Sequence, residues 1–195
     1  MEPASGNSIT IIVEGREVRT LRDILPASPG LHVLFVAKTP TPASVEEGHY
    51  FQGRQGRMFW NRLKNYDLLK RGTGFEDDLL LEHGYGLTDV VKEPHEFGDE
   101  PSSRKYLDGL YRILELVRVH HPTVVVFVYK KVLDEITRLG FGVEKKSDYG
   151  FNVSLETHFG TRVFVFPLPG TPCTKDKAVS AMRELKTACG RRSSA

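Results

Sequence analysis

The chain has few cysteines and no long apolar run. Its 195 residues include only Cys173 and Cys189, which are too few for a four-cysteine zinc or iron–sulfur site. No apolar run approaches the roughly 20 residues that span a bilayer. No positively charged segment followed by an apolar one opens the chain, as it would in a secretory signal. We therefore expect a cytoplasmic protein that has no contact with a membrane.

Phosphate-binding glycine motifs and metal-ligand spacings are also missing. The sequence contains neither G-x-x-x-x-G-K nor G-x-G-x-x-G, which argues against ordinary nucleoside triphosphate and dinucleotide enzymes. None of the 7 histidines has a convincing metal-binding spacing. We therefore predict that the protein needs no metal and no other cofactor. The net charge of +2 lacks the strongly basic signature of many nucleic-acid-binding proteins, so basic clusters matter only if folding gathers them at one edge.

The sequence predicts an N-terminal β-hairpin followed by a single larger domain. Residues 8–21, "SITIIVEGREVRTL", are typical of a hairpin with Glu-Gly at its turn. The segment "PASPG" then interrupts regular structure. We therefore predict a hairpin extension over residues 1–30, a folded domain over residues 31–190 and a polar tail over residues 191–195.

Buried strands and amphipathic helices alternate in the larger domain. Continuous apolar runs predict strands that are covered on both faces, as in a parallel sheet, at residues 33–37, 124–128 and 163–166. Helical patterns predict helices at residues 58–70, 104–119, 131–140 and 174–188. Thr174 is a plausible N-cap for the last helix, and Gly140 is a suitable stop for the third. This alternation predicts an α/β protein with three α/β/α layers around a mostly parallel central sheet.

The functional site is expected beyond the carboxyl ends of the strands, where ligands bind in open parallel sheets. The three apolar runs open into loops at residues 38–44, 129–131 and 167–175. A fourth strand-like stretch, residues 84–92, carries Asp89 among apolar neighbours. An acid in such a stretch either faces solvent or lies in a polar site. We therefore predict that these loops and Asp89 form the site.

The first loop combines rigid prolines with hydrogen-bonding and aromatic groups. Prolines fix the backbone close to a ligand, hydroxyl groups add neutral hydrogen bonds, and lysines at strand ends suit a phosphodiester. The residues that we predict to contact a base are Phe51, Tyr50, Lys38, Pro40, Thr41 and Ser44. A planar group held against an aromatic ring, with a polyanion beside it, describes a nucleotide flipped out of a duplex. It describes a free nucleotide equally well.

Four segments, in consistent order, resemble motifs of the uracil-DNA glycosylase superfamily. "AKTPT", "GHYF" and "RMFW" resemble the G-x-x-P-x loop and the Gly–aromatic–aromatic segment leading into R-F-W of the mismatch-specific uracil/thymine-DNA glycosylase branch. "YGLTDVVK" resembles that branch's G-x-T-[DK]-x-V segment, and "VFVFPLPGTPCTKD" resembles its second motif, a strand followed by a DNA-wedge loop. The resemblance spans residues 31–188 and identifies residues 31–190 as a uracil-DNA glycosylase-like domain.

Two positions depart from the pattern of that branch. Thr39 stands where the first loop often carries an Asn or Asp that positions the attacking water. Leu168 stands where the second motif often begins with a His or Asn that steadies the departing base. Some superfamily members with a similarly depleted first loop use an acid in the segment matching "LTDVV", and Asp89 matches that acid. The resemblance therefore implies Asp89 as the main catalytic residue, stabilising the cationic sugar and activating water, with Thr39 at the second catalytic position.

The resemblance also implies how DNA would be held. Phe51 would stack on the flipped base, and the loop 170–173 would fill the vacated space in the duplex. The amides that open the last helix favour phosphate. The residues that we predict to contact DNA are Gly170, Thr171, Pro172, Cys173, Thr174, Lys175, Arg54, Arg57 and Lys130. Lys38 is expected to contact a phosphate or a base edge rather than to form a Schiff base that cuts the strand.

These observations predict a monomeric, cofactor-free and monofunctional uracil-DNA glycosylase. It would flip uracil out of double-stranded DNA, hydrolyse the N-glycosidic bond and leave an abasic site; other deaminated or mismatched bases are open as substrates. Two alternatives stay open. One is a uracil- or lesion-binding protein with weak or no excision, because the usual polar groups are missing at Thr39 and Leu168. The other is an enzyme that acts on free nucleosides.

Overall fold

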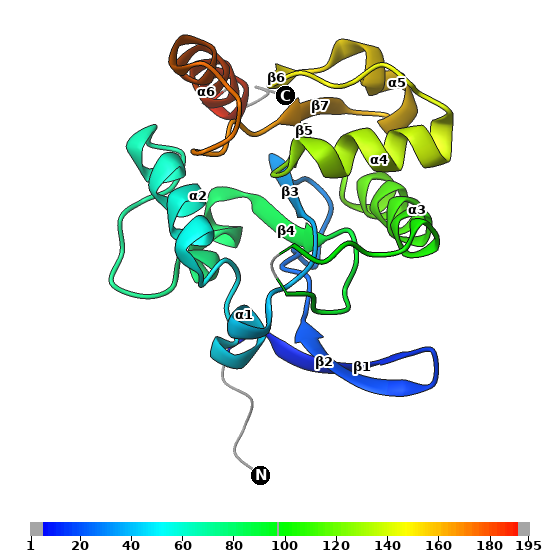
Figure 1. Ribbon diagram of the computed structural model, residues 1–195. Coiled ribbons are helices and arrows are strands. Elements are labelled where there is room, and N and C mark those ends of the chain that lie inside the picture. The colour runs from blue at the N-terminus through cyan, green and yellow to red at the C-terminus, as the bar shows by residue number, and fades with distance from the viewer. Residues whose placement is uncertain (1–5, 97, 191–195) are drawn as a thin grey trace.

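A five-stranded sheet forms the centre of the computed structural model, which describes residues 6–96 and 98–190 (Figure 1). The strands follow the order β4 (Tyr85–Asp89), β3 (Val33–Ala37), β5 (Val124–Phe127), β7 (Arg162–Val165) and β6 (Gly150–Phe151). All neighbours pair in parallel except β6, which is antiparallel to β7. The mostly parallel sheet that the apolar runs predicted is therefore confirmed.

Helices cover both faces of this sheet. In Figure 1, α2 (Arg54–Asn65) and α6 (Lys175–Gly190) lie on one side, and α3 (Ser103–His120) and α4 (Lys130–Phe141) lie on the other. A hydrophobic core lies on each face of the sheet, and alternate residues of β3 point into the two cores. Phe35 packs on the side of α2 and α6, whereas Leu34 and Val36 pack on the side of α3 and α4. The three-layer α/β/α architecture is thus confirmed.

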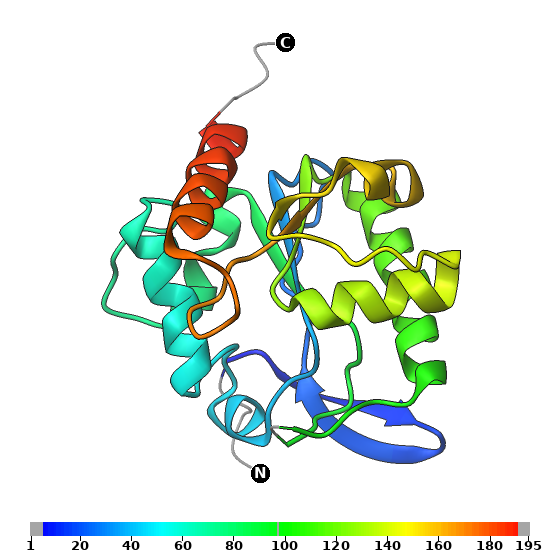
Figure 2. The ribbon, with the colours of Figure 1, turned by 45° about the horizontal axis from the view of Figure 1, so that its top comes forward.

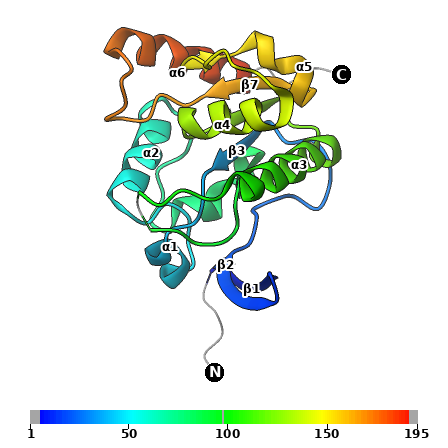
Figure 3. The same cartoon turned by 45° about the vertical axis from the view of Figure 1, so that its right-hand side comes forward.

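Two predicted helix limits were wrong. The helix expected over residues 58–70 runs from Arg54 to Asn65, because Tyr66 caps it and Asp67 has a positive φ of 55° that no α-helix continues through. The helix expected to stop at Gly140 continues to Phe141 and is capped by Gly142, with φ 67°. Gly140 instead allows close packing between α4 and α3, which Figure 3 shows side by side, because a Cβ there would come within 2.2 Å of Leu110 Cδ2.

The last helix begins where the sequence placed its cap. Helix α6 starts at Lys175, and the Lys177 amide donates to Thr174 Oγ1 at 3.4 Å. The Ala178 amide also donates to the backbone carbonyl of Thr174, at 2.9 Å. Thr174 therefore acts as the N-cap and fixes the point at which the predicted loop after β7 ends.

The predicted hairpin is present and lies at the carboxyl ends of the sheet strands. β1 (Ser8–Val13) and β2 (Arg16–Leu21) pair in antiparallel fashion around Glu14 and Gly15, which both have positive φ, as a tight hairpin turn requires. Figure 2 shows the hairpin beside α1 (Pro42–Glu47), and Ser8 Oγ donates to the carbonyl of Val45 at 2.7 Å. The division into units 1–30 and 31–190 stays a prediction, and the predicted tail, 191–195, lies outside the described residues.

The remaining elements are short. They are the 3-10 helices η1 (Glu76–Leu79), η2 (Leu81–His83) and η3 (Val153–Leu155) and the one-turn helix α5 (Glu156–Phe159). Across residues 6–96 and 98–190, no helix combines the length and the apolar character that crossing a bilayer would need.

Candidate active site

The carboxyl ends of the parallel strands bring the predicted loops to one edge of the sheet. Asp89, the last residue of β4, is paired with Ala37, the last residue of β3. The amide of Val91 then donates to the carbonyl of Lys38 at 3.0 Å, which ties the segment after β4 to the loop after β3. Because β5 and β7 run in the same direction, the segments that follow them open at this edge as well. The loop predicted over residues 129–131 was partly wrong, because Lys130 and Lys131 already belong to α4.

Asp89 is the most deeply buried acid at this edge. Its exposed fraction is 1%, and Lys92 Nζ donates to its Oδ2 at 3.1 Å. Its Oδ1 is buried and finds no hydrogen-bond partner within residues 6–96 and 98–190. Burial raises the pKa of the Asp89 carboxyl above its usual value, against the opposing charge of Lys92. One oxygen of Asp89 is therefore held by Lys92, while the other is a buried acceptor without a hydrogen bond among the described residues.

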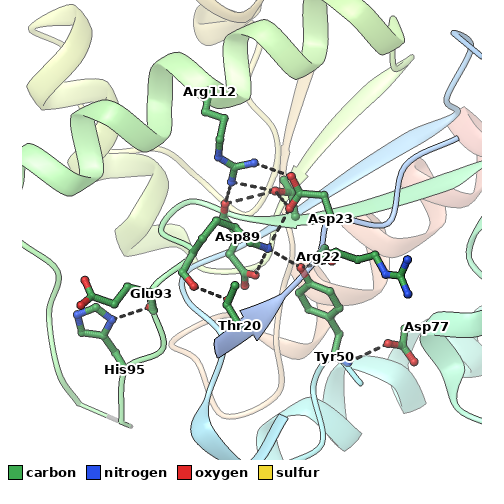
Figure 4. A network of polar contacts seen from close by, with 11 residues as sticks. Thr20, Arg22, Asp23, Tyr50, Asp77, Asp89, Glu93, His95 and Arg112 are labelled. Atoms are coloured by element: carbon green, nitrogen blue, oxygen red, sulfur yellow. Dashed lines mark hydrogen bonds and ion pairs between the residues drawn. The ribbon is translucent and has the colours of Figure 1, made fainter. Parts of the chain in front are cut away.

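A half-buried carboxylate, Asp23, completes a four-charge cluster around Asp89. Lys92 Nζ donates to Asp23 Oδ1 at 2.9 Å, and Arg112 Nη1 donates to Asp23 Oδ2 at 2.6 Å. Arg112 also donates to the backbone carbonyl of Asp89, and Thr88 Oγ1 donates to Asp23 Oδ1 at 2.7 Å (Figure 4). The two carboxylates and two cations balance in charge, which is what a buried ionic group requires.

The two aromatic residues of "HYF" have different environments. Tyr50 is 2% exposed; its hydroxyl donates to the Arg22 carbonyl at 3.1 Å and accepts from Lys92 at 2.9 Å. Burial and the negative charge of Asp89 raise the pKa of Tyr50 well above its usual value. Tyr50 therefore has no free face for a base and supports the cluster instead. Phe51 is half-buried and is therefore the less enclosed of the two residues.

The backbone of Phe51 is held in an uncommon conformation. Its φ is 59°, in the left-handed region that non-glycine residues seldom adopt. Its ring centroid lies 4.6 Å from that of Phe59 and 5.5 Å from that of Trp60, both on α2. Gly56 makes this approach possible, because a Cβ there would lie 2.0 Å from the Phe51 carbonyl oxygen. The ring is therefore placed by close contact with α2.

The loop after β3 uses several of its polar groups internally. Thr41 caps α1: its Oγ1 accepts from the Ser44 amide at 3.3 Å, and Ser44 Oγ accepts from the Gln52 amide at 3.2 Å. The second bond ties this loop to the segment that carries Phe51. Lys38 Nζ donates to the Asp99 carbonyl at 2.5 Å and pairs with Glu100 at 3.0 Å. Pro40 is buried and Thr39 is half-buried.

The loop after β7 has a buried base and an exposed tip. Arg62 donates to the carbonyl of Pro167, and Leu168 is 5% exposed. Thr171 bonds back to the Leu168 carbonyl through its amide at 3.3 Å and its hydroxyl at 2.6 Å. Gly170 has φ 86°. The tip of the loop is half-buried at Cys173 and exposed at Gly170, Pro172, Thr174 and Lys175.

The predicted basic contacts fall into two kinds. Arg54 and Arg57 are exposed in the first turn of α2 and can reach a phosphate. Lys130 is paired with Asp134 at 2.9 Å within α4, so part of its charge is already neutralised.

One set of side chains has the proximity of metal ligands. His49, Asp77 and Asp78 each offer a ligand atom, and these atoms lie within 4.8 Å of one another. Asp77, however, accepts hydrogen bonds from His49 Nδ1 at 2.9 Å, from the Tyr50 amide at 2.9 Å and from Asn7 Nδ2 at 3.1 Å. These bonds hold the segment that precedes Phe51, so we assign the set a structural role.

The comparison with known proteins agrees with this geometry. Residues 27–171 match the family described as "Uracil DNA glycosylase superfamily", which is well over half of the chain. The chain belongs to the uracil DNA glycosylase superfamily. It is also 26% identical over 138 residues to the "G/U mismatch-specific uracil DNA glycosylase" of Schizosaccharomyces pombe, across 69% of this chain and 42% of the relative. The predicted resemblance to the superfamily and its mismatch-specific branch is thus confirmed, although the chain spans less than half of that relative's length.

Within this superfamily member, the sequence did not single out three residues that bond to Asp89 or share its partners. They are Asp23, Lys92 and Arg112. Burial and the charge of Asp89 also raise the pKa of Tyr129, in the predicted loop after β5, to about 12. Lys92 lies three residues after Asp89, and this short spacing in the sequence could have indicated an ion pair between them.

Proposed function

We propose that this superfamily member removes uracil from double-stranded DNA by hydrolysis and leaves an abasic site. The observation that carries the proposal is the buried carboxylate of Asp89, with one oxygen anchored by Lys92 and the other without a hydrogen-bond partner among the described residues. Membership of the superfamily and the similarity to a G/U mismatch-specific uracil DNA glycosylase support uracil as the base. Water is the second reactant, so the reaction needs no cofactor.

The reaction breaks the bond between C1′ of the sugar and N1 of uracil. The sugar then carries developing positive charge, and the base leaves as an anion. An ionised Asp89 stabilises the sugar cation, and its free Oδ1 accepts a hydrogen bond from the attacking water. The water oxygen bonds to C1′, and its proton passes to the carboxylate and then to the base or solvent. Thr39, half-buried in the adjoining loop, supplies a neutral hydroxyl near the water.

Base flipping would use the exposed features of the same edge. Phe51, the less enclosed of the two aromatic residues, offers its ring, and stacking on an aromatic ring is worth about 1–3 kcal/mol per base. The tip at 170–173 would enter the duplex and fill the space left by the base, as apolar wedges do in other DNA-bending proteins. Arg54, Arg57 and Lys175 would contact phosphates.

A duplex with one uracil tests the proposal. The protein is incubated with the end-labelled duplex, and the products are heated in alkali, which cuts the strand at abasic sites. Strand breaks at the uracil after alkali are expected, together with intact strands when alkali is omitted. Breaks without alkali would instead indicate a lyase that acts through a lysine such as Lys38.

The main alternative is a lesion-binding protein that excises poorly. Leu168 favours it, because this buried apolar side chain occupies the position at which the branch often carries a polar group that steadies the departing base. Moreover, the amide of Thr171, a candidate donor to that base, is already bonded to the Leu168 carbonyl. A stable gel shift on the uracil duplex without alkali-labile sites would support this alternative and would contradict the hydrolase.

A further inference from the structure

Lys92 has the features of a residue that serves Asp89 rather than DNA. A lysine ammonium carries three N–H donors and no acceptor. Here three acceptors surround it, with Tyr50 Oη at 2.9 Å, Asp23 Oδ1 at 2.9 Å and Asp89 Oδ2 at 3.1 Å. Its side chain is 16% exposed. The ammonium is thus fully used by the protein and has no donor left for a phosphate.

Asp23 is the residue that shares Lys92 with Asp89. It follows the N-terminal hairpin and lies ahead of residue 27, where the superfamily match begins. Burial alone would raise the pKa of Asp23, yet the charges of Lys92 and Arg112 hold it below its usual value. Asp23 is therefore an anion at neutral pH, and it shares the Lys92 ammonium with Asp89.

The arrangement leaves Asp89 with a shared partner and one free oxygen. Lys92 pulls on Oδ2, while Arg112 fixes the backbone carbonyl of Asp89. Oδ1 is left without a hydrogen-bond partner in the described part of the chain. If Lys92 were lost, the carboxylate would be buried without a cation beside its oxygens. If Asp23 were lost, Lys92 would serve Asp89 alone.

We propose that Lys92 is a positioning residue that holds one oxygen of Asp89 and leaves the other for the reacting water, and that Asp23 of the N-terminal segment restrains Lys92. This inference rests on the proposed function, in which ionised Asp89 is the catalytic group. It extends the active site into a segment that the superfamily match does not cover. The N-terminal hairpin, whose Thr20 hydroxyl donates to the Lys92 carbonyl, then helps to fix the catalytic carboxylate.

Several titratable groups act on Asp89 together. Lys92 after β4 and Arg112 on α3 bond to it, and Asp23 after β2, Tyr50 after α1 and Tyr129 before α4 interact with it electrostatically. Both tyrosines have a raised pKa and are neutral at physiological pH. Arg112 stays charged. Lys92 and Asp23 are therefore the groups whose removal most changes the charge that Asp89 experiences.

The pH dependence of uracil excision tests the inference. Activity requires ionised Asp89, so the single-turnover rate should fall as the pH drops below the pKa of Asp89. This fall is the acid limb of the pH profile. Lys92→Met removes a stabilising cation and should move the acid limb up by about one pH unit or more, whereas Asp23→Asn should move it down. Lys92→Arg keeps the charge and should leave the limb close to that of the wild type. Acid limbs that do not move in either Lys92→Met or Asp23→Asn would overturn the inference.

A direct titration separates this inference from the proposed function. The carboxyl carbon of Asp89 is followed by carbon-13 NMR against pH, with its signal assigned by its loss in Asp89→Asn. The same opposite shifts are expected, and they need no excision. Shifted titrations in a protein that excises no uracil would sink the function and keep the contact network. Active protein with unshifted titrations would sink the inference alone.

Matched controls lie on the surface. Asp67 and Lys186 pair with each other at 2.8 Å between the end of α2 and α6, away from the cluster. Asp67→Asn and Lys186→Met make the same charge changes as the test variants and should leave the acid limb unchanged. Circular dichroism checks that each variant is folded. If Lys92→Met fails to fold, Asp23→Asn, which keeps the size of the side chain, still decides, because the inference requires its acid limb to fall.

Discussion

The cluster around Asp89 and the loop after β7 lie at the same edge of the sheet but are built in opposite ways. Around Asp89, side chains from four separate segments meet in the interior and bond to one another (Figure 4). The loop after β7 is instead held at its base by Arg62 and by its own Thr171, and its tip at Gly170 and Pro172 is exposed. One region is fixed by many long-range contacts and the other by few.

This difference fits two distinct tasks. A carboxylate that acts at a reacting carbon must be held in one geometry before the substrate arrives, because reorganisation during the reaction raises the barrier. A segment that enters a duplex has to adapt to DNA and gains its contacts only on binding. We therefore expect substitutions near Asp89 to alter the reaction rate or the stability strongly. Substitutions in the loop after β7 should mainly alter DNA binding.

Replacing the carboxylate should have the largest effect. Asp89→Asn keeps the size of the side chain but removes the charge that stabilises the sugar and activates water. The single-turnover rate of uracil excision should fall about 10²- to 10⁴-fold. Binding to the uracil duplex, measured by fluorescence anisotropy, should change much less. Asp67→Asn is the control, and full activity in Asp89→Asn would remove Asp89 from the mechanism.

The close contact between Gly56 and the backbone of Phe51 should also be sensitive to substitution, in its effect on stability. Alanine usually stabilises a helix by about 1 kcal/mol relative to glycine, but a Cβ at Gly56 would lie 2.0 Å from the Phe51 carbonyl oxygen. Gly56→Ala should therefore lower the free energy of unfolding by about 1–3 kcal/mol, measured by urea denaturation. Gly53→Ala, where a Cβ would meet nothing within 4 Å, should change it by less than half as much. Equal effects would show that Phe51 is not held by this contact.

Substitutions of two threonines allow a direct comparison between the cluster around Asp89 and the loop after β7. Thr88 is fully buried and bonds to charged Asp23 and Arg112, whereas the Thr171 hydroxyl bonds to a backbone carbonyl within its own loop. Thr88→Val should destabilise the protein by about 1.5–3 kcal/mol, and Thr171→Val by about 0.5–1.5 kcal/mol. Both are measured by urea denaturation. A larger loss of stability in Thr171→Val than in Thr88→Val would mean that the loop after β7 is the more tightly held region.

The smallest effect is expected at the exposed arginines of α2. Arg57→Met should weaken binding to uracil-containing and undamaged duplexes alike and should reduce the slope of log affinity against log salt by about 1, because one phosphate contact is lost. Binding is measured by anisotropy at several salt concentrations, with Lys186→Met as the control. A loss confined to the uracil duplex would indicate that Arg57 reads the base instead.

The sequence predicted those parts of the fold that local patterns determine. β3, β5 and β7 were foreseen because strands buried on both faces carry continuous apolar residues. The end of α2 was not, because the apolar residues Leu68 and Leu69 continue the helical pattern although Asp67 breaks the helix. Both leucines are buried from the turn that follows, so burial there does not require a helix.

The site was predicted in a similar, partial way. Asp89 was conspicuous as a lone acid in an apolar strand, and the order of the strands then brought it to the first loop. Asp23 carried no such signal, because its partners Lys92 and Arg112 lie far along the chain and meet it only through the path of the N-terminal segment. Tyr50 and Phe51 are adjacent in sequence, and only the folded chain shows that Tyr50 is buried and supports the cluster whereas Phe51 is half-buried.

The most direct test is the structure of the Asp89→Asn variant bound to a duplex that carries one uracil. We predict that the uracil lies outside the DNA helix, with its ring against Phe51 and its C1′ facing residue 89 beside the loop after β3. A uracil that stays stacked in the duplex, or one whose C1′ faces a different group, would contradict the assignment of Asp89 as the catalytic carboxylate.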